Sequence, residues 1–465
     1  MNYQVSQHID NNKVFIVQRS EIEGRLDPKM ALYNRKVQDS LYPKVKLKDV
    51  LVCKPQYGAS EPGVPRSSIK EPRYIRITDI DENGLISHDE LGATAKIIEN
   101  KYILCENDIL IARSGATVGK AYIHKPALYD CFFAGYLIRF IINTDKALPE
   151  YIFTYTQLNA YKEWVNAIQR PSGQPNINSE EYQSLEIPLP NIERQQVIVD
   201  VIKSAYLQKK QKESEAKQLL DNVDAYILNE LGITLPEIKT DLKNRIFKVN
   251  RSELEERLDP TVYKDGIKLI SNNYDNVKLS SVAYVNPTGT FKGKDIETPI
   301  SFIPMESIDE VYSEVSKLED TTIENASGFT KFKEGDLLWA KITPCMQNGK
   351  SAIAKNLTNG LGCGSTEFFV MRNKDGRLAI EYLHVILHMK CVRETAMLYF
   401  GGSAGQQRVS SAFLENFNLP LPPKDKQIEI ANHVYTIRQK AKALQEEGKV
   451  LLEEAKRKVE SMIIG

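Results

Sequence analysis

Two long stretches of the chain carry apolar residues at intervals of three and four and contain no proline. The first follows IPLP within Ile187 to Gly232, and the second follows LPLP within Leu419 to Gly465, 232 positions later. Proline fixes φ and disfavours helix in the residue before it, so each helix is expected to begin after these prolines. The apolar spacing is typical of an amphipathic helix with one buried stripe. Each stretch of roughly forty residues predicts a helix about 60 Å long.

Two amphipathic helices in one chain can bury their stripes against each other. We expect them to pair antiparallel as a coiled-coil spacer; the alternative is two unrelated surface helices.

The duplication extends over nearly the whole chain, which is the sequence signature of a repeated architecture. VQRSEIEGRLDPKMALY, from Val17, matches VNRSELEERLDPTVY, from Val249, and SGQPNINS matches AGQQRVSS, both at the offset of 232. ENDILIAR and EGDLLWAK match after a drift of a few positions. The repeat predicts globular modules at 1–186 and 233–418, each with an N-terminal arm, followed by helices at 187–232 and 419–465.

Each module mixes two periodicities. Runs rich in β-branched and aromatic residues, such as YIRITDI, AGYLIRFII, ISFIPM and EFFVMR, predict strands. LPEYIFTYTQLNAYKEWVNAI and AIEYLHVILHMKCVRETAML predict helix. We therefore expect an α+β fold of two tandem pseudo-repeated modules related by a pseudo-twofold axis.

Composition narrows the class only slightly. The 465 residues suffice for about two or three domains. Lys plus Arg and Asp plus Glu both number 61, so the net charge is zero; whether basic groups cluster then decides between nucleic-acid binding and its absence. Six cysteines without a CxxC pair suit a reducing compartment and argue against a zinc ribbon. No signal-peptide core or bilayer-spanning apolar run is found, so a cytoplasmic location without membrane contact is expected.

A glycine-containing loop recurs in both modules, RSGATVGK from Arg113 and KITPCMQNGK from Lys341. Glycines allow close backbone approach to a phosphate, lysine and arginine supply charge, and hydroxyls and amides donate hydrogen bonds. The alternative is a plain hairpin turn. Neither loop fits the P-loop pattern, because the first ends in alanine and the second has Pro344 at its first glycine position. The candidate nucleic-acid contacts are Arg113, Ser114, Gly115, Thr117, Lys120, Lys341, Thr343, Gln347, Asn348 and Lys350.

A second loop precedes each long helix. Glutamine and asparagine can bond adenine in a bidentate manner, and arginine can do so to guanine. The alternative is a helix-to-strand connection that packs the module against the long helix. The candidates in these loops are Arg170, Gln174, Asn176, Gln406, Gln407 and Arg408.

Other chemistry finds little support. The glycine-rich run from Phe400 has no counterpart in the first half and no (N/D)PP(Y/F) tetrapeptide accompanies it, so no methyltransferase site is expected. His384 and His388 could face one metal ion, but there is no HExxH and the first half has Phe153 and Gln157 at these places. We expect no metal site and no catalytic residue. The pairs Arg25 and Asp27, and Arg257 and Asp259, suit structural ion pairs of the two arms.

Taken together, these segments resemble the specificity subunit of type I restriction–modification systems. The resemblance rests on the paired IPLP and LPLP segments, each followed five residues on by Gln195 or Gln427. It rests also on ARSGATVGKA, AKITPCMQNGKSA, SGQPNI and the RLDP of both arms. It covers essentially the full chain, and the ordered set, present twice, carries it.

The resemblance implies that each module is a target-recognition domain reading one half of a split, asymmetric double-stranded DNA site. The helices would set the spacing and dock two methyltransferase (modification) subunits, which restriction/translocase subunits join. The candidate docking positions on the helices are Gln195, Val201, Leu220, Gln427, Val434 and Leu452. Adenine methylation with S-adenosylmethionine, and cleavage with ATP and Mg, would reside in these partners; this chain would be non-catalytic and hold no cofactor.

Two alternatives remain open. One is a specificity subunit of a type II-like or methylation-only system, which differs only in its partners. The other is a scaffold whose modules bind proteins. A DNA reader should gather its basic loop residues on one concave side, whereas a scaffold should scatter them. Zero net charge further predicts weak DNA binding by the isolated chain, because its partners would supply much of the phosphate contact.

Overall fold

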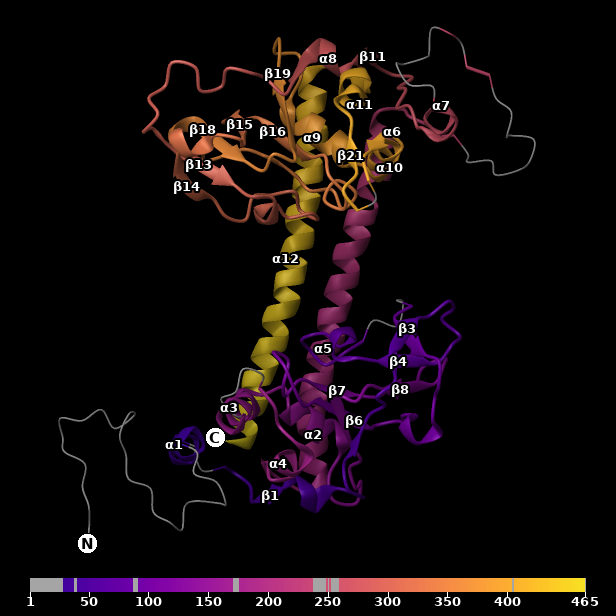
Figure 1. Cartoon of the computed structure of the whole chain (residues 1–465), viewed down its shortest axis with the longest axis vertical. Helices are drawn as coiled ribbons and strands as arrows, with labels where there is room; N and C mark the ends of the chain where they lie inside the picture. The colour runs from indigo at the N-terminus through magenta and orange to yellow at the C-terminus, as the bar shows by residue number, and fades with distance from the viewer. Residues whose placement is uncertain are drawn as a thin grey trace, which may run out of the picture. The chain divides into compact units, whose positions relative to one another are not determined.

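The computed structural model describes residues 28–36, 40–86, 91–169, 175–236, 248–249, 251, 259–403 and 405–464. By its internal contacts the chain divides into unit 1, residues 1–211 and 447–465, and unit 2, residues 212–446, and each unit holds part of both long helices (Figure 1). The following predicted residues lie outside the described ranges: Arg25, Asp27, Arg170, Gln174 and Arg257.

Unit 1 contains two four-stranded sheets and a two-stranded ribbon. The first sheet has the order β2 (Gln56–Tyr57), β9 (Leu137–Phe140), β6 (Ile109–Ala112), β7 (Ala121–Ile123). The second has the order β3 (Gly63–Pro65), β5 (Ala93–Ala95), β4 (Arg73–Ile75), β8 (Cys131–Phe133), with β4 and β8 parallel. The ribbon pairs β1 (Lys44–Lys46) with β10 (Glu186–Pro188). The helices are α1 (Pro28–Lys36), α2 (Pro149–Tyr155), α3 (Asn159–Ile168), α4 (Ser179–Gln183) and the first part of α5 (Ile192–Asp221), with 3₁₀ turns η2 (Leu47–Val50), η3 (Ile77–Asp79) and η4 (Asn100–Tyr102).

Unit 2 repeats this plan. Its first sheet has the order β12 (Ala283–Val285), β19 (Phe368–Asn373), β16 (Leu337–Ala340), β17 (Ser351–Ile353). Its second has the order β14 (Glu319–Thr322), β13 (Pro299–Ile303), β18 (Leu361–Gly364), β15 (Thr330–Lys333), with β13 and β18 parallel. Two ribbons pair β11 (Asp275–Lys278) with β22 (Asn418–Leu421) and β20 (Phe400–Gly401) with β21 (Arg408–Val409). The helices are α6 (Val223–Glu230), α7 (Pro260–Asp265), α8 (Leu279–Val282), α9 (Ile380–His388), α10 (Lys390–Met397), α11 (Ser411–Asn416) and α12 (Lys424–Ile463), with 3₁₀ turns η7 (Met305–Ser307), η8 (Glu324–Ala326) and η9 (Thr358–Gly360).

The duplication holds down to strand register. Val45 lies opposite Ile187 in unit 1, and Val277 lies opposite Leu419 in unit 2. The IPLP and LPLP segments are thus strand, as their prolines require, and a long helix follows each. The predicted α+β character and the long helix after each module are confirmed.

The first long helix differs in one respect from its prediction. It ends at Asp221 and a new helix, α6, begins at Val223, whereas α12 continues without interruption to Ile463. Within unit 1, Ile198 and Ile202 of α5 share a buried cluster with Leu452 and Val459 of α12. The antiparallel coiled coil over the full length stays a prediction.

In each unit, one buried glutamine attaches the module to its long helix. Gln195 accepts a hydrogen bond from Leu148 N at 2.8 Å and donates one to Pro190 O at 2.8 Å. Gln427 accepts from Ala379 N at 2.8 Å and donates to Pro422 O at 2.9 Å and Arg377 O at 3.0 Å. These bonds satisfy backbone groups that burial would otherwise leave unpaired.

Most of the predicted docking residues are buried within their own units, and their docking role stays a prediction. Gln195, Gln427 and Val434 are 0 % exposed and Leu452 is 2 % exposed. Val201 and Leu220 are half-buried against apolar clusters of their own units. The four buried side chains pack or bond internally, so they offer no surface to another subunit.

Candidate nucleic-acid interface

In unit 1 the structure brings the two predicted loops together. Ser114 and Asn176 form an antiparallel bridge. Gly115 N donates to Pro175 O at 3.0 Å, and Ile177 N donates to Arg113 O at 2.9 Å. Segments that are 62 positions apart in sequence (176 − 114) therefore lie side by side at the end of β6. This pairing fixes the loop backbone from which Arg113 and Asn176 project.

Two aromatic side chains accompany Arg113. Its guanidinium carbon lies 5.0 Å from the ring centroid of Tyr57, a distance at which cation and ring attract. Arg113 N donates to the carbonyl of Tyr136, whose side chain is 65 % exposed. Planar guanidinium and aromatic faces together suit contact with nucleotides. The motif-based prediction missed both residues, because Tyr57 lies in β2 and Tyr136 in the turn before β9, away from the two loops in sequence.

The remainder of the first loop is a hairpin turn, the alternative weighed from the sequence. It joins β6 to β7, with Gly119 N donating to Ala112 O at 2.9 Å and the buried Tyr161 hydroxyl donating to Gly119 O at 2.8 Å. The Lys120 ammonium donates to the carbonyl of Ile80. Lys120 therefore ties the turn to the residue that follows η3, and its predicted contact with nucleic acid stays a prediction. Thr117 is half-buried within the turn.

Unit 2 uses the same pairing with different side chains. Thr343 N donates to Gln407 O at 2.9 Å, Val409 N donates to Lys341 O at 2.9 Å, and Ile342 bridges Arg408. The Lys341 ammonium lies 5.5 Å from the Phe369 ring centroid. The architecture is thus repeated while the side chains it presents have diverged.

Arg408 is held by a carboxylate. Its Nε and Nη2 donate to Glu367 at 2.9 and 2.8 Å, and its Nη1 donates to Gln406 O at 2.9 Å. Bidentate arginine–carboxylate pairs are geometrically specific. The hydrogen bonds and charge of Arg408 lower the pKa of Glu367. Glu367 stands where unit 1 has Tyr136, since each residue's carbonyl accepts the amide of Arg113 or Lys341.

The other polar side chains of the loop that begins at Lys341 form hydrogen bonds with groups of unit 2 itself. The Thr343 hydroxyl donates to Gln347, and Asn348 donates to Glu310 at 3.1 Å. The Lys350 ammonium donates to Met305 O at 3.2 Å, as Lys120 does to Ile80 in unit 1. Lys350 thus tethers its loop as Lys120 does, and its predicted contact with nucleic acid stays a prediction.

The two histidines of α9, His384 buried and His388 half-buried, make separate hydrogen bonds. His384 Nε2 lies 3.1 Å from Ser351 Oγ, and His388 Nε2 lies 3.2 Å from Glu310 O. Burial lowers the pKa of His384 to about 3, with a further contribution from Arg438. Within the described residues, no group of three or more His, Cys, Asp or Glu side chains could hold a metal ion.

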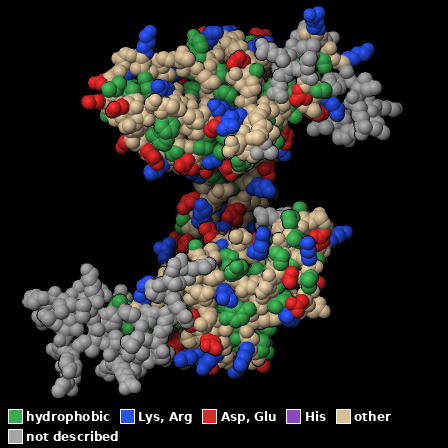
Figure 2. All heavy atoms as spheres, viewed as in Figure 1, with side chains coloured by type: hydrophobic (Ala, Val, Ile, Leu, Met, Phe, Trp, Pro, Cys, Tyr) green, Lys and Arg blue, Asp and Glu red, His purple; other side chains and the backbone are tan. Residues whose placement is uncertain are grey.

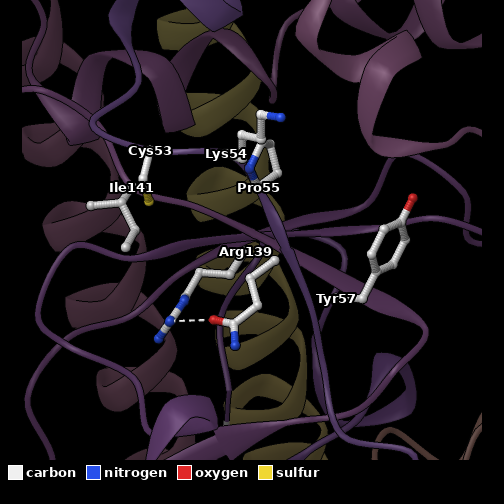
Figure 3. Close-up of a pocket in the computed structure, with 7 residues that line it drawn as sticks. Cys53, Lys54, Pro55, Tyr57, Arg139 and Ile141 are labelled. Carbon is white, nitrogen blue, oxygen red and sulfur yellow. Dashed lines mark hydrogen bonds between the residues drawn. The ribbon is translucent and has the colours of Figure 1, made fainter.

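Arg139 and Lys54 are among the residues that line a hollow in unit 1 (Figure 3). Arg139 donates to Gln56, to Ile103 O at 2.9 Å and to Asp108 at 3.4 Å. Arg372 and Asp336 form the equivalent ion pair in unit 2, at 2.6 Å. Because the charge of Arg139 is already engaged in this repeated structural pair, the hollow is not assigned to ligand binding.

Charges of both signs cover the visible surface. Figure 2 shows Lys and Arg side chains interspersed with Asp and Glu on each unit. Within each unit the two candidate loops meet. Arg113 lies next to the bridge between Ser114 and Asn176, and Lys341 lies next to the bridge between Ile342 and Arg408. Among the described residues, no helix has the length and apolar character needed to cross a membrane.

Comparison with known proteins gives one consistent result. A family model described as the type I restriction modification DNA specificity domain matches residues 70–220 and 271–453. These two regions fall in the two repeats and together cover most of the chain.

Relatives match over part of their length. The chain is 34% identical over 168 residues to the specificity subunit of the type I restriction enzyme EcoEI of Escherichia coli, covering 35% of this chain and 27% of that protein. It is 34% identical over 183 residues to the specificity subunit of EcoAI of the same organism, covering 38% and 29%. The matched segments thus span less than a third of each relative.

A solved structure of a chain from a type I R-M system assembly covers 90% of this chain and 96% of that chain, with a TM-score of 0.50 and 16% identity. At this identity the likeness shows the fold alone.

Proposed function

Because the chain belongs to the family of type I restriction modification DNA specificity domains, we propose that it is the DNA-reading subunit of a restriction–modification complex. Each unit reads one half of a split, asymmetric double-stranded site. The chain itself performs no chemistry.

One observation supports this proposal above the others. The same two-loop pairing occurs in both units, but it presents Arg113 and Asn176 in one and Lys341 and Arg408 in the other. Arginine favours guanine and asparagine favours adenine, so a shared backbone with different side chains suits two different half-sites. A scaffold that binds one kind of partner twice has no need for such divergence.

The partners follow from the proposed role. Two methyltransferase subunits dock on the helical region and bring S-adenosylmethionine; restriction/translocase subunits bring ATP and Mg. Docking involves exposed positions of the long helices, since the buried glutamines and apolar residues are engaged internally. A methylation-only or type II-like assembly would use the same chain with fewer partners.

The isolated chain binds DNA weakly in this account. The net charge is zero, and Lys120 and Lys350 are engaged by groups of the chain itself. Phosphate contact supplies most non-specific affinity, so the partners must contribute much of it. Tight binding by the chain alone that resists added salt would contradict this point.

The proposal is tested by sequencing modified bases in a host that expresses the chain with its cognate methyltransferase subunit, against a host with the methyltransferase alone. We expect adenine methylation at one asymmetric split site only when the chain is present. An unchanged methylation pattern, with the two subunits shown to co-purify, would contradict the proposal.

A further inference from the structure

A cleft in unit 2 lies beside the candidate interface and was not found from the sequence. Its volume is about 410 Å³. The loop that follows β12, strand β15, and the adjoining ends of β16 and β19 surround it, and Lys341 forms part of its wall. The lining residues are Asn286, Pro287, Thr288, Gly289, Thr290, Phe329, Thr330, Lys331, Lys341, Phe368 and Val370.

The chemistry of this lining suits an anion. Lys331 and Lys341 are its charged residues, and none of the described residues that line it is acidic. Outside the lining, the Glu367 carboxylate interacts with Lys341 but is paired with Arg408. The Lys331 ammonium lies 5.5 Å from the ring centroid of Phe291. Two lysines in a lining without an acidic residue create a positive potential that attracts phosphate.

Hydrogen-bond donors and an open backbone add to the fit. The Thr290 hydroxyl is buried and makes no hydrogen bond within the described residues. Gly289 has a φ of +72°, and a Cβ added there would meet nothing within 4 Å. The backbone of this loop can therefore come close to a ligand. Phe329 is 41 % exposed, which leaves an apolar surface beside the lysines for a sugar.

Unit 1 differs from unit 2 at the position of Lys331. Ile103 lies opposite Phe132, next to the parallel pair β4 and β8, and Lys331 lies opposite Cys363, next to the parallel pair β13 and β18. Register thus places Ile103 where unit 2 has Lys331. Arg113 matches Lys341, so Lys331 is the charge that distinguishes unit 2 here.

We propose that this cleft binds a backbone phosphate of the DNA that unit 2 reads, with Lys331 as a phosphate contact beside Lys341. The inference rests on the proposed function and deepens it, since it assigns phosphate binding to residues outside the two predicted loops. It also makes the two units unequal in their electrostatic contribution.

The test compares two lysines of one strand in the assembled complex with the methyltransferase subunits. Lys331→Gln removes the proposed contact, and Lys333→Gln removes the same charge two positions along β15, outside the cleft. Each phosphate contact contributes about 0.9 to the slope of log affinity against log salt. We expect K331Q to lower that slope by about 0.9 and the affinity about five- to tenfold at 0.1 M salt, with K333Q close to wild type.

A second measurement identifies the phosphate. Methylphosphonate groups, which carry no charge, are placed one at a time along the half-site read by unit 2. One position should weaken binding of wild type and K333Q but not of K331Q. Inorganic phosphate at millimolar concentration should not displace DNA from the complex, because a single anion lacks the neighbouring contacts that DNA makes.

The outcomes separate the two claims. If wild type binds its site specifically and K331Q behaves as K333Q does, the cleft assignment is wrong and the DNA-reading function stands. If the wild-type complex has no sequence preference, the proposed function itself fails. Equal thermal unfolding of both variants and wild type shows that neither change disturbs the fold.

Discussion

Replacement of Gln427 by leucine tests how each module is held on its long helix. Gln427 is 0 % exposed and makes three hydrogen bonds to backbone groups, two of them buried and one, to Arg377 O, partly buried. Leucine fills the space but pairs with none of them. A buried polar group left without a partner costs about 1–3 kcal/mol, so the expected loss is about 2–4 kcal/mol.

The repeat supplies an internal comparison. Gln195→Leu removes two bonds, to Leu148 N and Pro190 O, of which only the second is fully buried. Its expected loss is smaller, about 1–2 kcal/mol. Gln196→Leu changes the next residue, whose exposed side chain bonds Asp200, and should shift stability by less than about 0.5 kcal/mol.

The two tryptophans allow each unit to be followed separately. Trp164 is buried in unit 1 and Trp339 in unit 2, and they are the two tryptophans of the chain. Urea unfolding of Gln427 variants is read from Trp339 in a Trp164→Phe background, and that of Gln195 and Gln196 variants from Trp164 in a Trp339→Phe background. A loss at Gln427 no larger than that at Gln196 would refute the anchoring role.

Three further predictions concern the turn, the interface and pH. Gly119→Ala should destabilise unit 1 by about 2–4 kcal/mol, because φ is +87° and the new Cβ would lie 2.8 Å from Val165. Gly115→Ala, at φ +82° with nothing within 4 Å, should lower the free energy of unfolding by only about 1 kcal/mol, and equal urea midpoints of the two variants would contradict the clash. Glu367→Gln removes the carboxylate that holds Arg408, so affinity of the assembled complex for non-specific DNA should rise about two- to fivefold in gel-shift titrations; unchanged binding would place Arg408 away from DNA. Burial lowers the pKa of His384 to about 3, whereas a histidine in the unfolded chain has a pKa of about 6.5. Below about pH 6.5 the unfolded chain therefore binds a proton that the folded chain does not. The free energy of unfolding of unit 2 should fall by about 1.4 kcal/mol per pH unit from there toward pH 3. His388, whose pKa burial also lowers, adds a dependence of the same sign. His384→Phe, which carries the residue found in unit 1, should therefore reduce the dependence between pH 6.5 and 5.5 by about 1.4 kcal/mol per pH unit and leave the share of His388. An unaltered dependence would contradict the assignment.

Much of the architecture could be predicted because it depends on local signals. Prolines in IPLP and LPLP exclude helix and mark the strands β10 and β22, and the apolar spacing after them marks α5 and α12. The internal repeat then predicts the second unit from the first. The break at Asn222 carries no proline or glycine, so the sequence offered no signal for it.

The contact residues were predicted less well, because their roles depend on non-local neighbours. Lys120 and Lys350 follow glycine and read as exposed charges, but each finds a carbonyl of a 3₁₀ segment about forty residues away in sequence. Tyr136 lies in the turn before β9, Lys331 lies in β15, and neither belongs to a motif. Only the register of the sheets brings them to the interface and to the cleft.

The central claim is that the two units read different halves of one site. Random-sequence selection with the assembled complex measures this directly when it is repeated with Arg113→Ala and with Arg408→Ala. The account predicts a two-part consensus in which the first variant relaxes one part and the second variant relaxes the other. Relaxation of both parts by either variant, or of neither part by both, would contradict it.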